Sequence, residues 1–321
     1  MANFIDPAIL FFVFGFFAGF VKSNLEIPPQ ISRFLSLYLL MALGLKGGFA
    51  LAQSGFTAHV ALSLGIAVFM AILVPLVAYS LLSRVISRFD AAALAATYGS
   101  VSAVTFITAT QHLDQSGIAY GGHMAAAMAL MESPAIIIAI LFANRVRQSQ
   151  ANGQQAENVS IGKLLHESFT DGAQLLLLGA MVVGLATGDG GQKVMGPFSV
   201  DLFKGMLAFF LLDMGLTAAR NFKSVLSQSF FVALYGVVAP ITHAMVALGL
   251  CYVFGLPLGE TVLLMVLAAS ASYIAVPAVL RESMPEANPG LYFGMSLGLT
   301  FPLNIIVGIP LYTWIAEQVI R

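Results

Sequence analysis

Two stretches of the chain place hydroxyl groups in the middle of long apolar segments. They lie at 96–105 and 265–281, and the second ends shortly after Pro277. Small residues, hydroxyls and a proline weaken a helix, and irregular backbone is tolerated at membrane depth only where it is buried in protein or lines a cavity. Two interrupted segments in corresponding halves of a chain are typical of a transporter's substrate site. The residues that could form such a site are Gly99, Ser100, Ser102, Thr105, Ser270, Ala271, Ser272 and Tyr273.

We expect each stretch to break a helix near mid-membrane, with a second half-helix beginning near Ala103 in one and near Ile274 in the other. A helix N-terminus carries roughly half a positive charge and unpaired N–H donors, which favours an anion. The neighbouring hydroxyls would donate to an anion or coordinate a small cation. In the alternative interpretation, the small residues only permit close helix packing and the serines bond backbone carbonyls.

One carboxylate, Glu132, lies within a predicted span, just before Ser133 and Pro134. An ionisable residue inside a span is costly and is a functional candidate by default. Glu132 could coordinate Na⁺, carry a proton or accept a structural hydrogen bond. The oxygen ligands that we nominate for Na⁺ are Ser102, Glu132, Ser270, Ser272 and Asn304.

For the other charged and reactive residues we expect structural roles. Asp213 and Lys46 are expected to form a structural ion pair between two helices. Cys251 is the only cysteine, which excludes an internal disulfide and a cysteine-based metal cluster. Apart from Na⁺ as a coupling ion, no cofactor is expected. The sequence has no phosphate-binding loop, Gly-x-Ser-x-Gly elbow or His-Glu-x-x-His motif, so we do not expect an enzyme.

The composition indicates a polytopic membrane protein. Hydrophobic residues make up 59% of the 321 residues and charged residues only 9%, whereas a soluble domain is roughly 25% charged. The apolar runs are continuous and do not alternate as they would in a membrane barrel. The net charge of −1 provides no basic surface for nucleic acid. The predicted fold class is therefore all-α.

The apolar runs predict about ten transmembrane helices in two five-helix repeats. The expected spans are 4–21, 31–49, 58–82, 90–111, 121–144, 165–187, 202–219, 228–254, 260–281 and 290–316, of which the fourth and ninth are broken. Residues 1–144 would form the first repeat, 145–164 a cytoplasmic linker and 165–321 the second repeat. Motifs recur in order about 170 residues later, as in Gly44-Leu45 and Gly215-Leu216. Because five is odd, the second repeat would be inverted.

The basic residues predict the orientation. Ten of the 14 lie on one face, in the loops after odd-numbered spans: Lys22, Arg33, Arg84, Arg88, Arg145, Arg147, Lys163, Arg220, Lys223 and Arg281. By the positive-inside rule this face is cytoplasmic. We therefore expect a multi-pass protein of the cell's inner (plasma) membrane with both termini outside the cytoplasm.

Four segments occur in a familiar order along nearly the whole chain. They are Tyr98–Ser102 with Thr105, Met131–Ala135, Ala269–Ser272 with Pro277, and Ala287–Pro289. They resemble the sodium-dependent bicarbonate transporter family, best known from cyanobacteria. The resemblance implies inverted five-helix repeats, a homotrimer in the lipid bilayer, and Na⁺-coupled bicarbonate uptake by an elevator-like movement, with the substrate between the broken helices.

The chain departs from the family pattern at both breaks. Tyr273 occupies the place of an aspartate, Ala275 that of a hydroxyl residue, and Ala103-Val104 that of Gly-Ser. These changes remove a hard oxygen ligand and anion donors, while Glu132 keeps an acid where the family has Asp. Because the linker is short, the resemblance does not extend to the family's PII-like regulatory partner.

Three functions remain open from the sequence. The first is a secondary active transporter, a Na⁺-coupled symporter for bicarbonate or a related small anion. The second is a transporter of another small metabolite or organic anion, for which Tyr273 would provide a stacking face and Glu132 a route for H⁺ coupling. The third is a membrane sensor or scaffold that retains the fold without transport.

Overall fold

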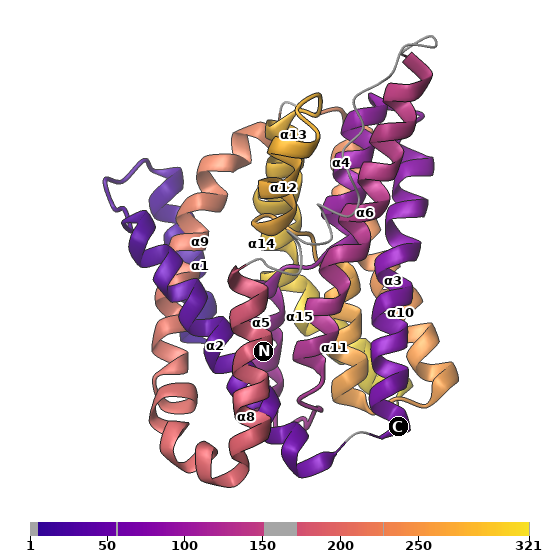
Figure 1. Cartoon of the computed structure of the whole chain (residues 1–321). Helices are drawn as coiled ribbons and strands as arrows, with labels where there is room; N and C mark the ends of the chain where they lie inside the picture. The colour runs from indigo at the N-terminus through magenta and orange to yellow at the C-terminus, as the bar shows by residue number, and fades with distance from the viewer. Residues whose placement is uncertain (1–5, 56, 151–171, 227, 321) are drawn as a thin grey trace.

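The computed structural model describes residues 6–55, 57–150, 172–226 and 228–320, and its regular secondary structure in these ranges is helical throughout (Figure 1). The first part contains α1 (Pro7–Phe20), α2 (Pro29–Ser54), α3 (Ala58–Leu82), α4 (Arg88–Gly99), α5 (Ala103–Ser116) and α6 (Met124–Gln150). Most of the predicted linker, 145–164, lies outside the described residues.

The second part begins with α8 (Gly172–Gly196), a short π-helix η2 (Pro197–Asp201), α9 (Phe203–Leu226) and α10 (Phe230–Phe254). It continues with α11 (Leu258–Ala269), α12 (Ala275–Ser283), α13 (Pro289–Phe293), η3 (Gly294–Thr300), α14 (Phe301–Leu303), η4 (Asn304–Gly308) and α15 (Ile309–Val319). The starts of the predicted spans 4–21 and 165–187 fall outside the described residues. Otherwise each predicted span coincides with one helix or with a run of consecutive helices.

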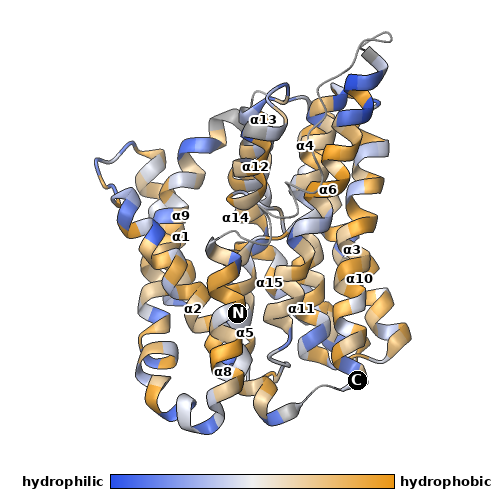
Figure 2. Ribbon diagram, viewed as in Figure 1, coloured by the Kyte–Doolittle hydropathy of each residue, from blue (hydrophilic) through white to orange (hydrophobic). Residues whose placement is uncertain are grey.

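The helices have the length and composition expected in a membrane. Seven candidate spans occur in the described residues, with the shorter apolar helices α1 and α11 in addition. Hydrophobic residues run along the helices, while hydrophilic residues gather at their ends (Figure 2). The prediction of an all-α, multi-pass membrane protein is confirmed. The arrangement of ten spans as an inverted repeat stays a prediction.

Two predicted spans are interrupted where the sequence indicated. The chain leaves helical geometry between α4 and α5 at Ser100–Ser102, and between α11 and α12 at Ser270–Ile274. Pro277 is the third residue of α12, where a missing N–H removes no intrahelical bond. Pro277 therefore helps the second half-helix to begin, and the small and hydroxyl residues before it form the break. Pro134, by contrast, lies inside the continuous α6.

The helices form two groups, which we call the frame group and the crossing group. The frame group is α1, α2, α8 and α9, whose most extensive contacts are α2 with α8 and α1 with α9 (left in Figure 1). The crossing group contains α3–α6 and α10–α15. In the predicted repeat, α1 corresponds to α8 and α2 to α9. The contact of α1 with α9 therefore corresponds to the contact of α8 with α2. We call the two ends of the molecule the α13 end and the η2 end.

Glycines set the closeness of the frame contacts. A Cβ atom at Gly215 on α9 would overlap the Phe12 carbonyl oxygen on α1, and one at Gly44 on α2 would overlap the Leu177 carbonyl oxygen on α8. Small residues let helix backbones approach closely in membranes, where packing drives helix association. The recurrence of Gly44 and Gly215 in the sequence thus reflects two close helix crossings.

This packing predicts that Gly215→Ala destabilises the protein while Gly205→Ala on the same helix does not. The added methyl group at position 215 must separate α1 from α9, at a cost of about 1–3 kcal/mol. A Cβ at Gly205 meets no atom within 4 Å, and the higher helix propensity of alanine adds up to about 1 kcal/mol. Thermal unfolding in detergent measures both. Equal melting temperatures for the two variants would contradict this account of the crossing.

Candidate functional site

The two broken helices cross at their breaks and bond to each other there. The Ser272 N–H donates to the Thr97 carbonyl oxygen of α4 at 2.8 Å. The Ser102 N–H donates to Oγ of Ser270, just after α11, at 3.1 Å. Backbone donors in a membrane must find partners within the protein, and each break supplies one for the other. This crossing therefore fixes the two breaks relative to each other.

Two of the predicted serines accept hydrogen bonds from the first turns of the second half-helices. Ser102 Oγ accepts from the Thr105 N–H at 3.2 Å and from the Thr105 hydroxyl at 2.9 Å, as an N-cap of α5. Ser272 Oγ accepts from the Val276 N–H at 3.3 Å in the first turn of α12. These bonds satisfy N–H groups that a helix N-terminus otherwise leaves unpaired. They stabilise the first turn of each half-helix.

A cavity of about 140 Å³, which we call the crossing cavity, lies beside this crossing and between the two helix groups. The start of α5 and the start of α12 both line it. The frame group contributes side chains from α2 and α8, and α6 lines it from the crossing group. Its lining includes Ser36, Leu40, Ser102, Ala103, Met128, Glu132, Gln174, Ser272, Tyr273 and Ile274.

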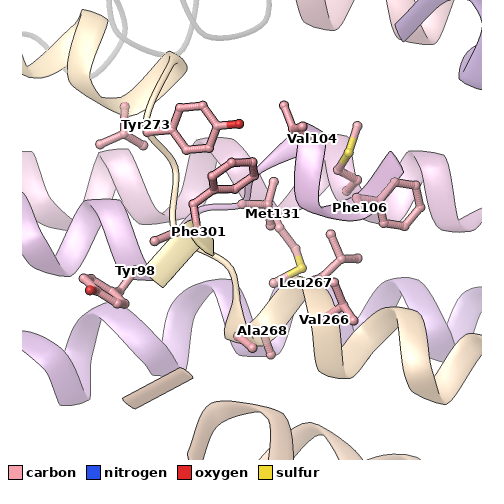
Figure 3. Packing of buried hydrophobic residues seen from close by; sticks show 14 of the residues in the cluster. Tyr98, Val104, Phe106, Met131, Val266, Leu267, Ala268, Tyr273 and Phe301 are labelled. Atoms are coloured by element: carbon pink, nitrogen blue, oxygen red, sulfur yellow. The ribbon is translucent and has the colours of Figure 1, made fainter. Parts of the chain in front are cut away.

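Tyr273 occupies the second break and is 5% exposed. Its ring packs edge-on against Phe301 with a centroid distance of 5.0 Å, and Figure 3 shows the two rings beside each other. The Tyr273 hydroxyl lies near Ser102 but makes no hydrogen bond of standard geometry. It is therefore a buried polar group at the cavity wall that can still serve a solute.

Glu132 is the only charged side chain among the described residues that line the crossing cavity. The side-chain amide of Gln174 on α8 donates a hydrogen bond to its Oε2 atom. This bond joins the crossing group to the frame group next to the cavity. The sequence interpretation missed Gln174, because a single neutral amide inside a predicted span carries no distinctive signal.

The predicted residues are thus divided between two places. Ser102, Ser272, Tyr273 and Glu132 line the crossing cavity, whereas Gly99, Ser100, Thr105, Ser270, Ala271 and Asn304 do not. Ser270 Oγ donates to the Leu267 carbonyl oxygen at 2.8 Å. Asn304 donates to the Ala269 carbonyl oxygen at 2.8 Å and accepts from the Tyr312 hydroxyl at 3.2 Å. Both are buried structural partners of the second break and its surroundings.

The nominated Na⁺ ligands are divided in the same way. Ser102, Ser272 and Glu132 share the cavity, while Ser270 and Asn304 lie behind the break. Within the described ranges, no group of three or more His, Cys, Asp or Glu side chains could hold a metal ion. A small cation here would depend on hydroxyl, carbonyl and single-carboxylate oxygens, and the ligand set stays a prediction.

Comparison with known families agrees with this arrangement. The model of the Na⁺-dependent bicarbonate transporter superfamily matches residues 7–317, which include both broken helices and the crossing cavity. The chain belongs to this superfamily. Among curated proteins, none matches the sequence. The family resemblance of the sequence is therefore confirmed, and the chain is a multi-pass membrane protein of a transporter family.

In this superfamily member, two acids begin the first halves of the broken helices, and the sequence interpretation overlooked them. Asp90 on α4 accepts from the Asn288 N–H at 2.8 Å. Glu260 on α11 accepts from the Ser63 hydroxyl at 2.7 Å and lies 3.6 Å from His123 Nε2. Each acid holds the loop next to its half-helix. Their spacing follows the 170-residue recurrence of the serines, which was the signal that could have revealed them.

The expected ion pair of Lys46 with Asp213 is wrong. The Lys46 Nζ atom lies 2.8 Å from Asp114 Oδ2 on α5, and Asp213 on α9 lies near Ser32 and Arg220. The physical reason is the packing of α2 against α8. It turns the Lys46 side chain toward the crossing group and away from the part of α9 that carries Asp213.

The first break provides a matched pair of serine substitutions. Ser102→Ala removes the cap of α5 and should lower the free energy of unfolding by about 1 kcal/mol. The buried Ser100 hydroxyl has no hydrogen-bond partner, so Ser100→Ala should leave stability unchanged or slightly raise it. Thermal unfolding in detergent compares the two. Greater destabilisation by Ser100→Ala would contradict the assignment of Ser102 as the capping residue.

Proposed function

We propose that the chain is a secondary active transporter that carries a small anion, bicarbonate by the name of its superfamily, together with Na⁺. The observation that carries this proposal is the convergence of two half-helix N-termini on one small cavity at the crossing. Ser102 and Ser272 bond to the first turns of those helices and line that cavity. The N-terminal ends would provide the positive field for an anion, since the described residues that line the cavity include no lysine or arginine.

The size of the crossing cavity supports a small solute. Its volume of about 140 Å³ is well below the roughly 300–1,000 Å³ of sites that hold drug-sized ligands. The buried Tyr273 ring fills the part of the second break where the family pattern has a smaller aspartate. An ion of a few heavy atoms suits this space, and its oxygens would accept from the hydroxyls of Ser272 and Tyr273.

Glu132 supports coupling to a cation. A carboxylate and an anion in the same small cavity repel each other strongly where water is scarce. A bound Na⁺ would offset that repulsion and would be attracted by both charges. Each ligand would then raise the affinity for the other, and this reciprocal coupling is what symport requires.

The arrangement of the two groups supports alternating access. The crossing cavity lies between the frame and crossing groups, so that a movement of one group past the other would change its opening. We propose an elevator-like movement of this kind in an inverted-repeat protein with both termini outside the cytoplasm. A homotrimer in the inner (plasma) membrane is proposed from the superfamily resemblance.

A second candidate is an H⁺-coupled transporter of a small organic anion. Tyr273 favours it, because its ring lines the cavity and presents apolar surface there, and Glu132 can exchange a proton. For such a transporter, uptake would follow a proton gradient and would need no Na⁺.

Uptake of labelled bicarbonate into proteoliposomes tests the proposed function. We expect accumulation driven by an inward Na⁺ gradient, and little uptake when K⁺ replaces Na⁺. Glu132→Gln should reduce the Na⁺-driven rate by tenfold or more. The loss of a charge interaction of about 1.4 kcal/mol corresponds to a factor of ten. Protein that remains folded and takes up no bicarbonate would refute the assignment of substrate.

Two substitutions of Tyr273 refine this experiment. Tyr273→Asp restores a hard oxygen ligand and should strengthen the dependence of uptake on Na⁺. Tyr273→Asn introduces a side chain of nearly the same size as aspartate but without its charge. It therefore controls for loss of the tyrosine ring. An identical Na⁺ response in the two variants would mean that this position does not contribute to the cation site.

A further inference from the structure

A second cavity lies between the two helix groups at the η2 end. It has a volume of about 280 Å³ and we call it the η2-end cavity. The frame group contributes α2, the end of α8 and η2, and the crossing group contributes α5, the start of α6 and the loop 117–123. Its lining includes Leu43, Lys46, Gly47, Ala50, Gln53, Phe106, Asp114, Ala119, Tyr120, Gly122 and Ala125.

Three helices line both cavities with residues one turn apart. On α2 the pair is Leu40 and Leu43, on α5 it is Ala103 and Phe106, and on α6 it is Met128 and Ala125. Three residues correspond to about 4.5 Å along a helix axis. The two cavities therefore lie in line on the same helix faces, separated by roughly one helical turn.

Buried apolar side chains close the space between the cavities. Phe106, Met128 and Leu43 are 1%, 3% and 4% exposed. Figure 3 shows Phe106 on α5, two residues beyond Val104. This apolar layer separates the two cavities in the present state, so that a solute in one is screened from the other.

The η2-end cavity differs from the crossing cavity in its charge. Among the described residues of its lining, Lys46 and Asp114 carry the charge. They are 26% and 39% exposed, so that solutes and water reach the pair. Because Lys46 belongs to the frame group and Asp114 to the crossing group, any sliding of the groups must separate them.

Each partner has a second contact that it would keep. The Lys46 Nζ atom lies 5.4 Å from the centre of the Phe203 ring, within the frame group. Asp114 interacts with Tyr120 within the crossing group, and burial together with this carboxylate raises the pKa of Tyr120, which keeps its hydroxyl a neutral donor. Separation of the pair would leave Asp114 with its Tyr120 partner and the Lys46 ammonium beside the Phe203 ring without a carboxylate to neutralise it.

We propose that the η2-end cavity is the loading site for anions at the other end of the transport path, with Lys46 as its anion-attracting residue. Asp114 neutralises Lys46 in the present state. Movement of the crossing group releases the ammonium when the η2 end opens. This inference rests on the proposed function for the transported solute, but the charge of the cavity can be measured without transport.

Thiol-reactive reagents of opposite charge measure that property directly. Cys251, the only cysteine, is buried, and Cys251→Ala provides a background for single reporters. Ala119→Cys places a thiol at an exposed position of the cavity lining. The rate with a sulfonate-bearing methanethiosulfonate is divided by the rate with its trimethylammonium analogue. Val253→Cys, exposed at the end of α10, is the control reporter.

We expect opposite effects from removal of the two charges. Lys46→Met should lower the ratio of anionic to cationic rates at the Ala119→Cys reporter by roughly threefold or more, and Asp114→Asn should raise it by a similar factor. Lys46→Arg should keep the original ratio. None of these variants should change the ratio at the Val253→Cys reporter. Unchanged ratios at the Ala119→Cys reporter, or equal shifts in one direction, would overturn the proposal.

Uptake of labelled bicarbonate provides a functional test. Lys46→Met should raise the apparent KM for uptake from the η2 end, whereas Asp114→Asn should lower it. A purely structural pair would make both variants similarly defective and would be rescued by exchange of the two residues. If the unmodified protein takes up no bicarbonate, the proposed substrate fails, while the thiol ratios still decide the role of Lys46.

Discussion

The rest of the structure depends on how two interrupted helices satisfy their own backbone inside an apolar environment. An unpaired N–H or carbonyl group costs several kcal/mol where no water can reach it. The two breaks solve this by reciprocal bonds, from the Ser272 N–H to the Thr97 carbonyl oxygen and from the Ser102 N–H to Ser270 Oγ. Each break is therefore stable only in the presence of the other, and α4, α5, α11 and α12 form one unit.

This constraint determines what chemistry is left for a solute. The oxygens of Ser102 and Ser272 already accept hydrogen bonds at the starts of α5 and α12, so they offer a solute their O–H groups. In the proposed function, two half-helix N-termini would provide the positive field, and Glu132 is the only charged side chain among the described residues of the cavity lining. Such a site is poor for an anion alone. It becomes favourable when a cation binds beside it, which connects the geometry to symport.

The positions of the breaks could be predicted from the sequence because their causes are local. Gly99 weakens a helix because it lacks a side chain, and Ser102 and Ser270 form local hydrogen bonds through their own hydroxyls. Pro277 suits the first turn of a helix. The start of α5 at Ala103 follows from those residues alone. The same holds for α12, which begins one residue after the position expected. Which serines line the cavity and which bond to the backbone could not be predicted, because this depends on which helix lies opposite each serine.

Lys46 was given the wrong partner for the same reason, since only the packing of α2 on α8 directs it toward Asp114. Ser270 bonds across the crossing and lies behind the cavity, while Ser272 lines it. Glu260 is different. It follows Asp90 at the spacing of the repeat and was within reach of sequence reasoning.

The central claim is that an anion and Na⁺ bind together at the crossing cavity. Thermal unfolding of the purified protein with bicarbonate, with Na⁺ and with both tests it most directly. A ligand that binds only the folded state raises its stability according to its concentration and affinity. The account predicts that both ions together raise the melting temperature by more than the sum of their separate effects. A bicarbonate shift of the same size in Na⁺ and in K⁺ would contradict it.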